Sequence, residues 1–176
     1  NGQVNLNGNA LVEFNSGQIT TINTGSQLSL SGNARVADTG STSTNSALVG
    51  LTSNAGQFIL HNGATVATSG AFANSGNLFV DTNFGSGGSS LTIGGTLTNT
   101  NQVTLGNTAL NTSDTVAVGG ISNTGGILNI NGNTTGGSLN QMTLDVNSVA
   151  GFGAAGVVNG QVNLNGNALV EFNSGQ

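Results

Sequence analysis

The sequence predicts an all-β chain that winds as a right-handed parallel β-helix, with about six rungs in each 158-residue repeat. Three observations lead to this prediction. Apolar residues alternate with polar ones over short stretches, glycine and asparagine separate these stretches, and the sequence repeats on two length scales. No segment shows sustained helical periodicity, and the helix formers Lys, Glu and Met are nearly absent.

The longer repeat is read from the two ends of the sequence. NGQVNLNGNALVEFNSGQ stands at residues 1–18 and again, without a single change, at residues 159–176. Selection for structure alone would keep the apolar pattern and let the polar letters drift. We therefore interpret residues 1–158 as one complete unit and residues 159–176 as the first rung of the next, in a longer tandem array.

The shorter repeat is a phrase that begins with an apolar anchor and recurs about every 26 residues. The anchors are Ile22, Leu51, Phe72, Leu97, Ile121 and Val157, and we expect them to form a buried column in the core. Asn stands two residues after four of them, at Asn74, Asn99, Asn123 and Asn159, and we expect these amides to stack as a ladder. The alternation after the anchors predicts that eight side chains point inward: Leu28, Leu30, Leu78, Val80, Val103, Leu105, Leu128 and Ile130.

Irregular inserts separate some phrases, at Ser41–Ser46, Phe84–Ser90 and Gly132–Ser138, and we expect them to leave the stack as loops. Their variable length argues against a strict left-handed hexapeptide helix and favours the looser right-handed form. A string of β-sandwich modules is the alternative fold. The chain has no Trp to pin a sandwich core and no Tyr for its corner.

Composition excludes several classes of protein. The chain has no Cys, which rules out disulfides and thiolate metal sites. Its net charge is −5 and its one basic residue is Arg35, so we expect no nucleic-acid partner and no electrostatic docking on anionic lipid. The longest apolar run, Ala150–Val158, is too short and too rich in glycine to insert into a membrane.

The repeated L-x-N-x-G-x-L-x-L phrases, poor in charge and without Cys, resemble the passenger regions of bacterial autotransporters and filamentous-haemagglutinin-type surface proteins. The resemblance covers essentially the whole unit, and its motif is specific to the architecture alone. It implies a right-handed β-helix exported to the bacterial cell surface, and it transfers no site residues. The unchanged long repeat departs from most passengers, whose rungs diverge, and indicates an extended fibre.

Few residues suggest chemistry, and we expect no enzyme, no catalytic residue and no cofactor. His61, the one imidazole, is interpreted as a solvated loop residue. The acids come about one per rung, and Arg35 stands three residues before Asp38, so we expect a surface ion pair and solubilising charge: Glu13, Asp38, Asp81, Asp114 and Asp145. Asp81 and Asn83 open a stretch that resembles a calcium loop, but Thr92 stands where the loop needs Glu. A file of Thr and Ser after the anchors is interpreted as small polar turn residues rather than as an ice-binding face.

The expected function is structural: an extracellular fibre or adhesin stalk on the bacterial surface, built from repeats that continue end to end. The expected partners are adjacent identical repeats, with surface glycans or other cells as further candidates. Two alternatives from other classes stay open. One is an adhesin module whose loops bind carbohydrate or a host ligand, and the other is a β-helix carbohydrate enzyme.

Overall fold

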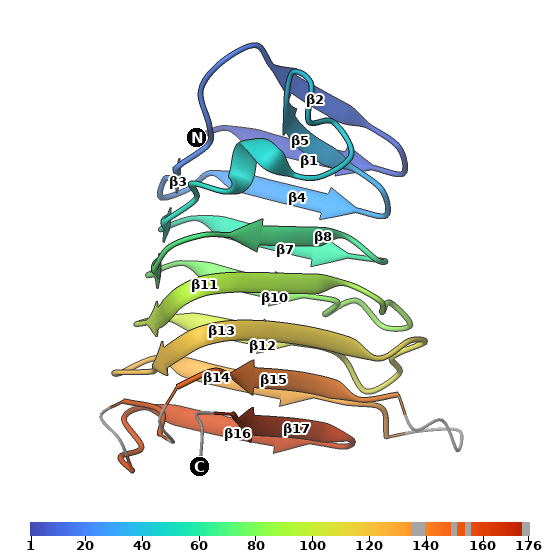
Figure 1. The fold of residues 1–176 in the computed structure, drawn as a ribbon. Helices are drawn as coiled ribbons and strands as arrows, with labels where there is room; N and C mark the ends of the chain where they lie inside the picture. The colour runs from blue at the N-terminus through green and yellow to red at the C-terminus, as the bar shows by residue number, and fades with distance from the viewer. Residues whose placement is uncertain (135–139, 149–150, 154–155, 174–176) are drawn as a thin grey trace.

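The computed structural model describes residues 1–134, 140–148, 151–153 and 156–173, and this part of the chain is all-β (Figure 1). Its strands pair in parallel in every ladder described. Helix is limited to one short 3-10 turn, η1 (Ser46–Leu48). None of the helical structure in these residues is long and apolar enough to cross a membrane. The prediction of an all-β chain is confirmed.

Seven strands form the first sheet, which extends along the whole stack in Figure 1. Their order in the sheet is their order in the chain: β1 (Gln3–Asn7), β4 (Gln27–Ser31), β7 (Gln57–His61), β10 (Asn77–Val80), β12 (Gln102–Leu105), β14 (Ile127–Asn131) and β16 (Gln161–Asn165). We call each pass of the chain from one of these strands to the next a rung. Neighbouring strands are in register, so Val4 lies opposite Leu28, and Leu28 lies opposite Phe58.

Eight strands form the second sheet, in which β8 pairs with β11 beside the main path. They are β3 (Thr21–Ile22), β6 (Ser53–Asn54), β8 (Thr65–Thr68), β9 (Phe72–Asn74), β11 (Ser90–Asn99), β13 (Asp114–Ser122), β15 (Met142–Val146) and β17 (Ala168–Phe172). The first half of β11 pairs with β8 and its second half with β9. The halves meet at Gly94 and Gly95, where a Cβ would lie 2.5 Å and 2.6 Å from backbone atoms of the rung before. The close approach requires glycine at this bend.

β2 (Leu11–Phe14) and β5 (Arg35–Asp38) form a separate two-stranded sheet. The residues that follow β5 fold back and supply Asn45 as a bridge from β5 to β8. Asn45 Oδ1 accepts the backbone N–H of Val36 at 2.7 Å, and Nδ2 donates to the carbonyl of Thr65 at 2.7 Å. Asn45 is 6% exposed, so the expectation that Ser41–Ser46 is an external loop is wrong for the end of that insert.

Apolar side chains from the rungs meet in one core. The eight residues predicted to point inward are all buried, with Leu28 the most exposed at 3%, which confirms the predicted inward face. Phe58 and Phe72 come from β7 and β9 of the same rung, and their ring centroids lie 6.3 Å apart inside the core. Strict alternation along short strands places each apolar residue above its equivalent in the next rung.

The other predicted inserts differ from the expectation in part. In Phe84–Ser90, Phe84 is 82% exposed, but Ser86 and Ser89 are buried. Of Gly132–Ser138, residues 135–138 lie outside the described residues.

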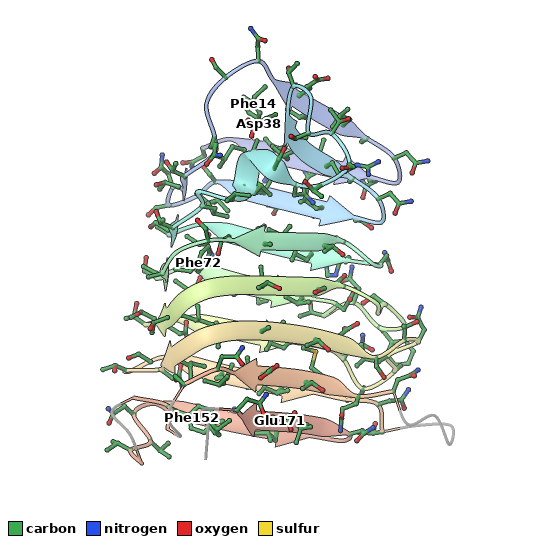
Figure 2. The ribbon with its side chains drawn as sticks, viewed as in Figure 1. Phe14, Asp38, Phe72, Phe152 and Glu171 are labelled. Atoms are coloured by element: carbon green, nitrogen blue, oxygen red, sulfur yellow. The ribbon has the colours of Figure 1, made fainter. Side chains whose placement is uncertain are left out.

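Arg35 does not form the expected ion pair with Asp38. Its guanidinium donates instead to the carbonyl of Ser43 at 3.2 Å, and in the described part of the chain no salt bridge joins it to an acid. Asp38 lies opposite Phe14 in the pairing of β5 with β2 (Figure 2). Arg35 and Asp38 are three residues apart in one strand, so their side chains point to opposite faces and cannot pair with each other.

Candidate functional site

Four buried asparagines form a column along the second sheet, which we call the asparagine ladder. Its members are Asn54, Asn74, Asn99 and Asn123, and none is more than 1% exposed. Nδ2 of each of the first three members donates to the Oδ1 of the next, at 2.7, 2.8 and 2.7 Å. Each Nδ2 also donates to a backbone carbonyl at the start of a first-sheet strand in the next rung: Asn77, Gln102, Ile127 and Gln161. The buried amides are thus hydrogen-bonded on both sides, and they join four rungs.

Asn159, the fourth residue predicted for the ladder, does not hold its next place. Asn123 Nδ2 donates to the carbonyls of Gly126 at 3.2 Å and Gln161 at 2.9 Å instead. The amide of Asn159 lies against Gly153, where a Cβ would be 2.5 Å from Nδ2.

Asn54 is the ladder member that sequence reasoning missed. It lies opposite Asn74 in register, so the position opposite Phe72 is Thr52 rather than the predicted anchor Leu51. Leu51 is buried, but the phrase around it has one extra residue. A search that allowed one inserted residue would have found Asn54.

The other predicted anchors divide into two groups. Phe72, Leu97 and Ile121 are in register and buried. Ile22 is buried too, but it lies opposite Asn54, so it occupies the ladder column rather than the anchor column.

The last anchor, Val157, is 41% exposed, and the expectation that it is buried is wrong. Its carbonyl accepts the N–H of Phe152 at 3.0 Å in a local loop. Phe152 holds the core position in this rung, because its carbonyl accepts the N–H of Asn123 and its ring packs edge-on against Phe172 at 5.4 Å.

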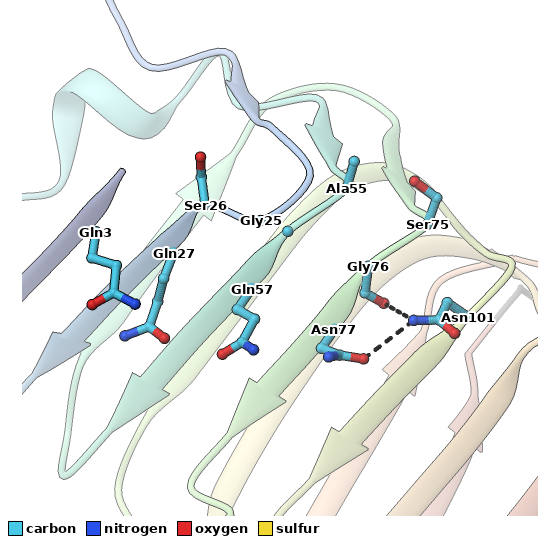
Figure 3. A pocket seen from close by; sticks show the side chains of 11 residues that line it. Gln3, Gly25, Ser26, Gln27, Ala55, Gln57, Ser75, Gly76, Asn77 and Asn101 are labelled. Carbon is cyan, nitrogen blue, oxygen red and sulfur yellow. Dashed lines mark hydrogen bonds between the residues drawn. The ribbon is translucent and has the colours of Figure 1, made fainter. Parts of the chain in front are cut away.

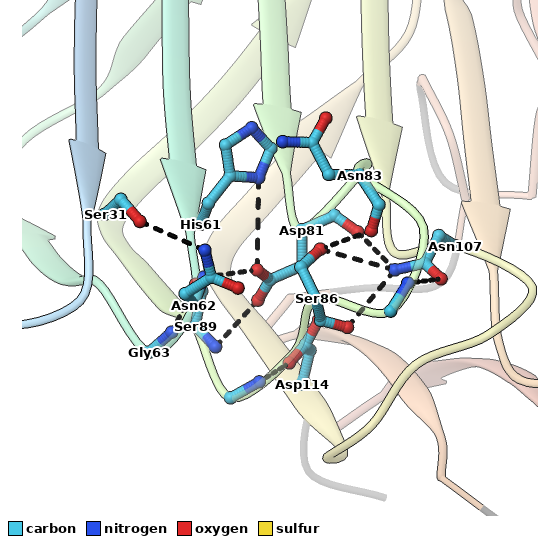
Figure 4. A network of polar contacts seen from close by, with 12 residues as sticks. Ser31, His61, Asn62, Gly63, Asp81, Asn83, Ser86, Ser89, Asn107 and Asp114 are labelled. Carbon is cyan, nitrogen blue, oxygen red and sulfur yellow. Dashed lines mark hydrogen bonds and ion pairs between the residues drawn. The ribbon is translucent and has the colours of Figure 1, made fainter. Parts of the chain in front are cut away.

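The second polar feature is a group of three side chains from three successive rungs, which we call the acid cluster: His61, Asp81 and Asp114 (Figure 4). Asp81 is fully buried, and its two carboxylate oxygens accept the backbone N–H groups of Asn62 at 2.7 Å and Ser89 at 2.8 Å. His61 Nδ1 lies 4.0 Å from Asp81 Oδ1. The expectations of a solvated His61 and of solubilising charge at Asp81 and Asp114 are therefore wrong.

Asp114 is the group whose ionisation the fold opposes most. Its Oδ1 accepts the N–H of Gly88, whereas its Oδ2 is buried without a donor. Burial first, and the negative charge of Asp81 second, raise the pKa of Asp114 from 3.8 to about 8. A neutral carboxylic acid carries an O–H that can donate to Asp81, so protonation satisfies the atom that a carboxylate would leave without a partner.

The same burial lowers the pKa of His61 below its ordinary value, against the opposing effect of Asp81. The lowered pKa of His61 favours the neutral imidazole, and the raised pKa of Asp114 favours the neutral acid. The two backbone N–H groups are the hydrogen-bond donors to Asp81. Both carboxyl groups are buried, and this favours a structural role that holds three rungs together over contact with a substrate.

Asp81 and Asn83, the residues considered for calcium, are not brought together as ligands. Asp81 faces backbone N–H groups, and Asn83 is exposed and uses its carbonyl to accept the N–H and the hydroxyl of Ser86. In the ranges that the structure describes, no three His, Asp or Glu side chains are grouped so that they could hold a metal ion.

A shallow groove of about 250 Å³ lies on the outside of the first sheet, and we call it the amide groove (Figure 3). Its wall is a column of amides at the first position of consecutive strands: Gln3, Gln27, Gln57 and Asn77. Its floor is the corner where Gly56 and Gly76 stack, and a Cβ on either would lie 2.2 Å from a carbonyl oxygen of the rung before. None of the described residues that line it is charged.

Comparison with known proteins identifies no relative of this chain. No protein-family model, no curated protein and no solved structure matches the chain.

Proposed function

We propose that this chain is a segment of a structural fibre or adhesin stalk: a right-handed parallel β-helix that continues from one 158-residue unit to the next, on the outside of a bacterial cell. One observation carries the proposal. The sequence QVNLN pairs in parallel register with β4 as β1, and with β14 as β16. The same strand therefore fits both after the sixth rung of a unit and before the second.

The arrangement of the rungs supports the coiled form of this proposal. Each rung returns to the first sheet in register with the rung before, and parallel crossovers of this kind are almost always right-handed. The amide columns and the near absence of charge suit a stack of like on like, because identical charges one above another would repel.

Imaging of a longer array tests the fibre. A chain with three copies of residues 1–158 followed by residues 159–176 should form one unbroken rod. Six rungs at about 4.8 Å each give an advance of about 29 Å per unit. A spacing of about 50 Å or more per unit would mean separate domains on a string and would refute the proposal.

The amide groove favours a second candidate, a module that binds uncharged carbohydrate. A row of amides offers paired donors and acceptors to sugar hydroxyls without a charged competitor. Binding of neutral glycans on an array, reduced at least tenfold by Gln57→Ala but unchanged by Asn83→Ala on a distant loop, would support this module. Release of reducing ends from a polysaccharide would instead indicate an enzyme.

A further inference from the structure

The two identical segments are paired on opposite edges. The first copy (residues 1–18) contains β1 and β2, which pair with β4 and β5. The second copy (residues 159–176) contains β16 and β17, which pair with β14 and β15. Among the described residues, no strand pairs with the edge of either copy that the other copy uses. The two copies thus display both sides of one rung.

The first copy binds β4 through a particular set of backbone atoms. The carbonyl of Gly2 accepts the N–H of Gln27 at 2.9 Å, and the N–H of Gly8 donates to the carbonyl of Ser31 at 3.0 Å. In the numbering of the segment, positions 2 and 8 face the rung that follows.

The second copy binds β14 through different atoms. The N–H of Gln161 donates to the carbonyl of Gly126 at 2.9 Å, and the carbonyl of Asn165 accepts the N–H of Gly132 at 2.9 Å. These are positions 3 and 7 of the same segment, and they face the rung that precedes. The four groups are different atoms. The carbonyl at position 7 also accepts the N–H of Ala10 in the first copy, at 3.2 Å, but a carbonyl oxygen has two lone pairs, so one copy can make both sets of bonds at once.

The side chains divide in the same way. Asn5 Oδ1 accepts Nε2 of Gln27 at 2.5 Å, whereas the equivalent Asn163 uses Nδ2 to donate to Asn129 Oδ1 at 2.7 Å. One asparagine at this position would therefore link the amide of the rung before to the amide of the rung after.

Two side-chain oxygens accept a donor in both copies. The first is that of Asn5, because the equivalent oxygen of Asn163 accepts Nε2 of Gln161 at 3.3 Å. The second belongs to Asn9 and Asn167. Asn9 Oδ1 accepts Nδ2 of Asn33 at 3.2 Å, and the equivalent oxygen of Asn167 accepts Nε2 of Gln141 at 3.3 Å. An amide oxygen has two lone pairs and can accept both donors.

The exposure of the apolar side chains also shows that each copy is covered by a neighbouring rung on one side. Val4 is 39% exposed in the first copy, and Leu164 is 48% exposed in the second, although both occupy inward positions of their strands. Their equivalents Val162 and Leu6 pack against the core. A single copy with neighbours on both edges would cover both positions.

We infer that the eighteen-residue segment is a two-sided connector through which two copies of this chain join, the second copy of one molecule taking the place of the first copy on β4 and β5 of the next. This inference rests on the proposed fibre and goes beyond it, because it says that separate chains, and not only covalent repeats, assemble through one shared rung. The number of paired strand edges is the same before and after such an exchange, and the displaced segment regains conformational entropy.

Disulfide trapping in the full chain tests the inference, because the chain has no cysteine of its own. Ser29 lies opposite Asn5, so in a joined pair Asn163 of one molecule lies opposite Ser29 of the other. Adjacent strands are about 4.8 Å apart, within the span that a disulfide bridges. We expect Ser29→Cys with Asn163→Cys, in a chain whose own first rung is weakened by Leu6→Asp, to form a ladder of head-to-tail oligomers on oxidation.

The competing arrangement has its own pair of cysteines. If whole ends stack without exchange, Asn163 of one molecule lies over Asn5 of the next, and Asn5→Cys with Asn163→Cys forms the ladder instead. That result would overturn the shared rung. Monomers from both pairs at high protein concentration, with the circular dichroism of folded β-structure retained, would also overturn it.

A peptide with the sequence of residues 1–18 provides a test that needs no destabilising substitution. The peptide carrying Asn5→Cys should exchange with the first copy of a Ser29→Cys chain and form a disulfide with it, and an unmodified peptide should compete. No adduct would refute the connector. A continuous rod from the three-unit chain would still support the fibre, so the two proposals fail separately.

Discussion

The backbone N–H groups at strand edges are paired in different ways in the first two rungs and in the middle rungs of the stack. In the middle, the first half of β11 has a strand on each edge, with β8 before it and β13 after it. β5 has β2 on one edge, but on the other edge its N–H groups are accepted by side chains. Val36 donates to Asn45 Oδ1 at 2.7 Å, and Asp38 donates to Ser46 Oγ at 2.8 Å.

This difference shows which part of the stack must be continuous. Across the interruption between β5 and β8, the first sheet passes from β4 to β7 with no shift of register, from Gln27 opposite Gln57 to Ser31 opposite His61. The β3, β6 and β9 strands of the second sheet are continuous here too, so two rows of strands keep these rungs aligned. An insert can then enter another row, provided that its side chains satisfy the backbone groups that a strand would have paired.

The largest expected effect is the difference in stability between a charge placed in a middle rung and one placed in an end rung. Leu105 is fully buried in the middle, so Leu105→Asp leaves an unpaired charge in the core and should cost about 5 kcal/mol in free energy of unfolding. Val4→Asp, on an inward position that is 39% exposed at the end, should cost less than about 1 kcal/mol. Urea unfolding measures both. Equal costs would contradict the comparison.

The next effect tests the acid cluster in the middle rungs. Asp114 has a pKa of about 8 in the folded chain and 3.8 as its ordinary value, so the folded state binds the proton more tightly. Its contribution to stability is complete below about pH 4 and is lost as the pH rises through about 8. We expect the wild type to lose a few kcal/mol through this group between pH 5 and 8, and Asp114→Asn to abolish that loss.

His61 acts in the opposite direction in the same measurement. Its pKa is lowered by burial, so its contribution is present above about 6.5 and is lost as the pH falls. Urea unfolding of Asp114→Asn in a His61→Gln background separates the two groups. If the His61→Gln variant with Asp114 intact keeps the same stability from pH 5 to 8, Asp114 is ionised in the fold.

A third, smaller effect concerns the asparagine ladder. Asn99→Ala removes the acceptor of Asn74 Nδ2 and the donor to Asn123 Oδ1, and should cost about 3 kcal/mol in free energy of unfolding. Asn83→Ala is the matched control on an exposed residue and should cost less than about 0.5 kcal/mol. Similar thermal midpoints for the two variants would mean that the ladder adds nothing to stability.

The smallest effect tests the interrupted row itself. Asn45→Ala removes the bridge between Val36 and Thr65, and should cost about 2 kcal/mol. We expect the loss to be local, with faster amide hydrogen exchange at Val36 and unchanged exchange at Leu105 in the middle. Faster exchange in both places would show that the continuous rows of strands do not keep the rungs aligned when the bridge is lost.

The alternation of the strands allowed the inward face to be predicted, because a period of two residues leaves one choice of face. Leu28 and Leu105 follow from that rule alone. The exact register could not be predicted from that rule, because one extra residue after Leu51 moves Asn54 into the ladder. The acid cluster could not be predicted either, since His61, Asp81 and Asp114 are distant in sequence and meet only when three successive rungs stack. Val157 was misplaced because a loop of its own rung presents Phe152 to the core.

The asparagine ladder gives the stack a direction. All three amide–amide bonds run the same way, with Nδ2 of the earlier rung donating to Oδ1 of the later one. Their dipoles therefore add, and each bond polarises the next. The ladder begins beside the apolar Ile22 and ends at Asn123, whose N–H groups are accepted by carbonyl oxygens. A column of this kind cannot be reversed without breaking every bond, so units that add to it would all have to point the same way.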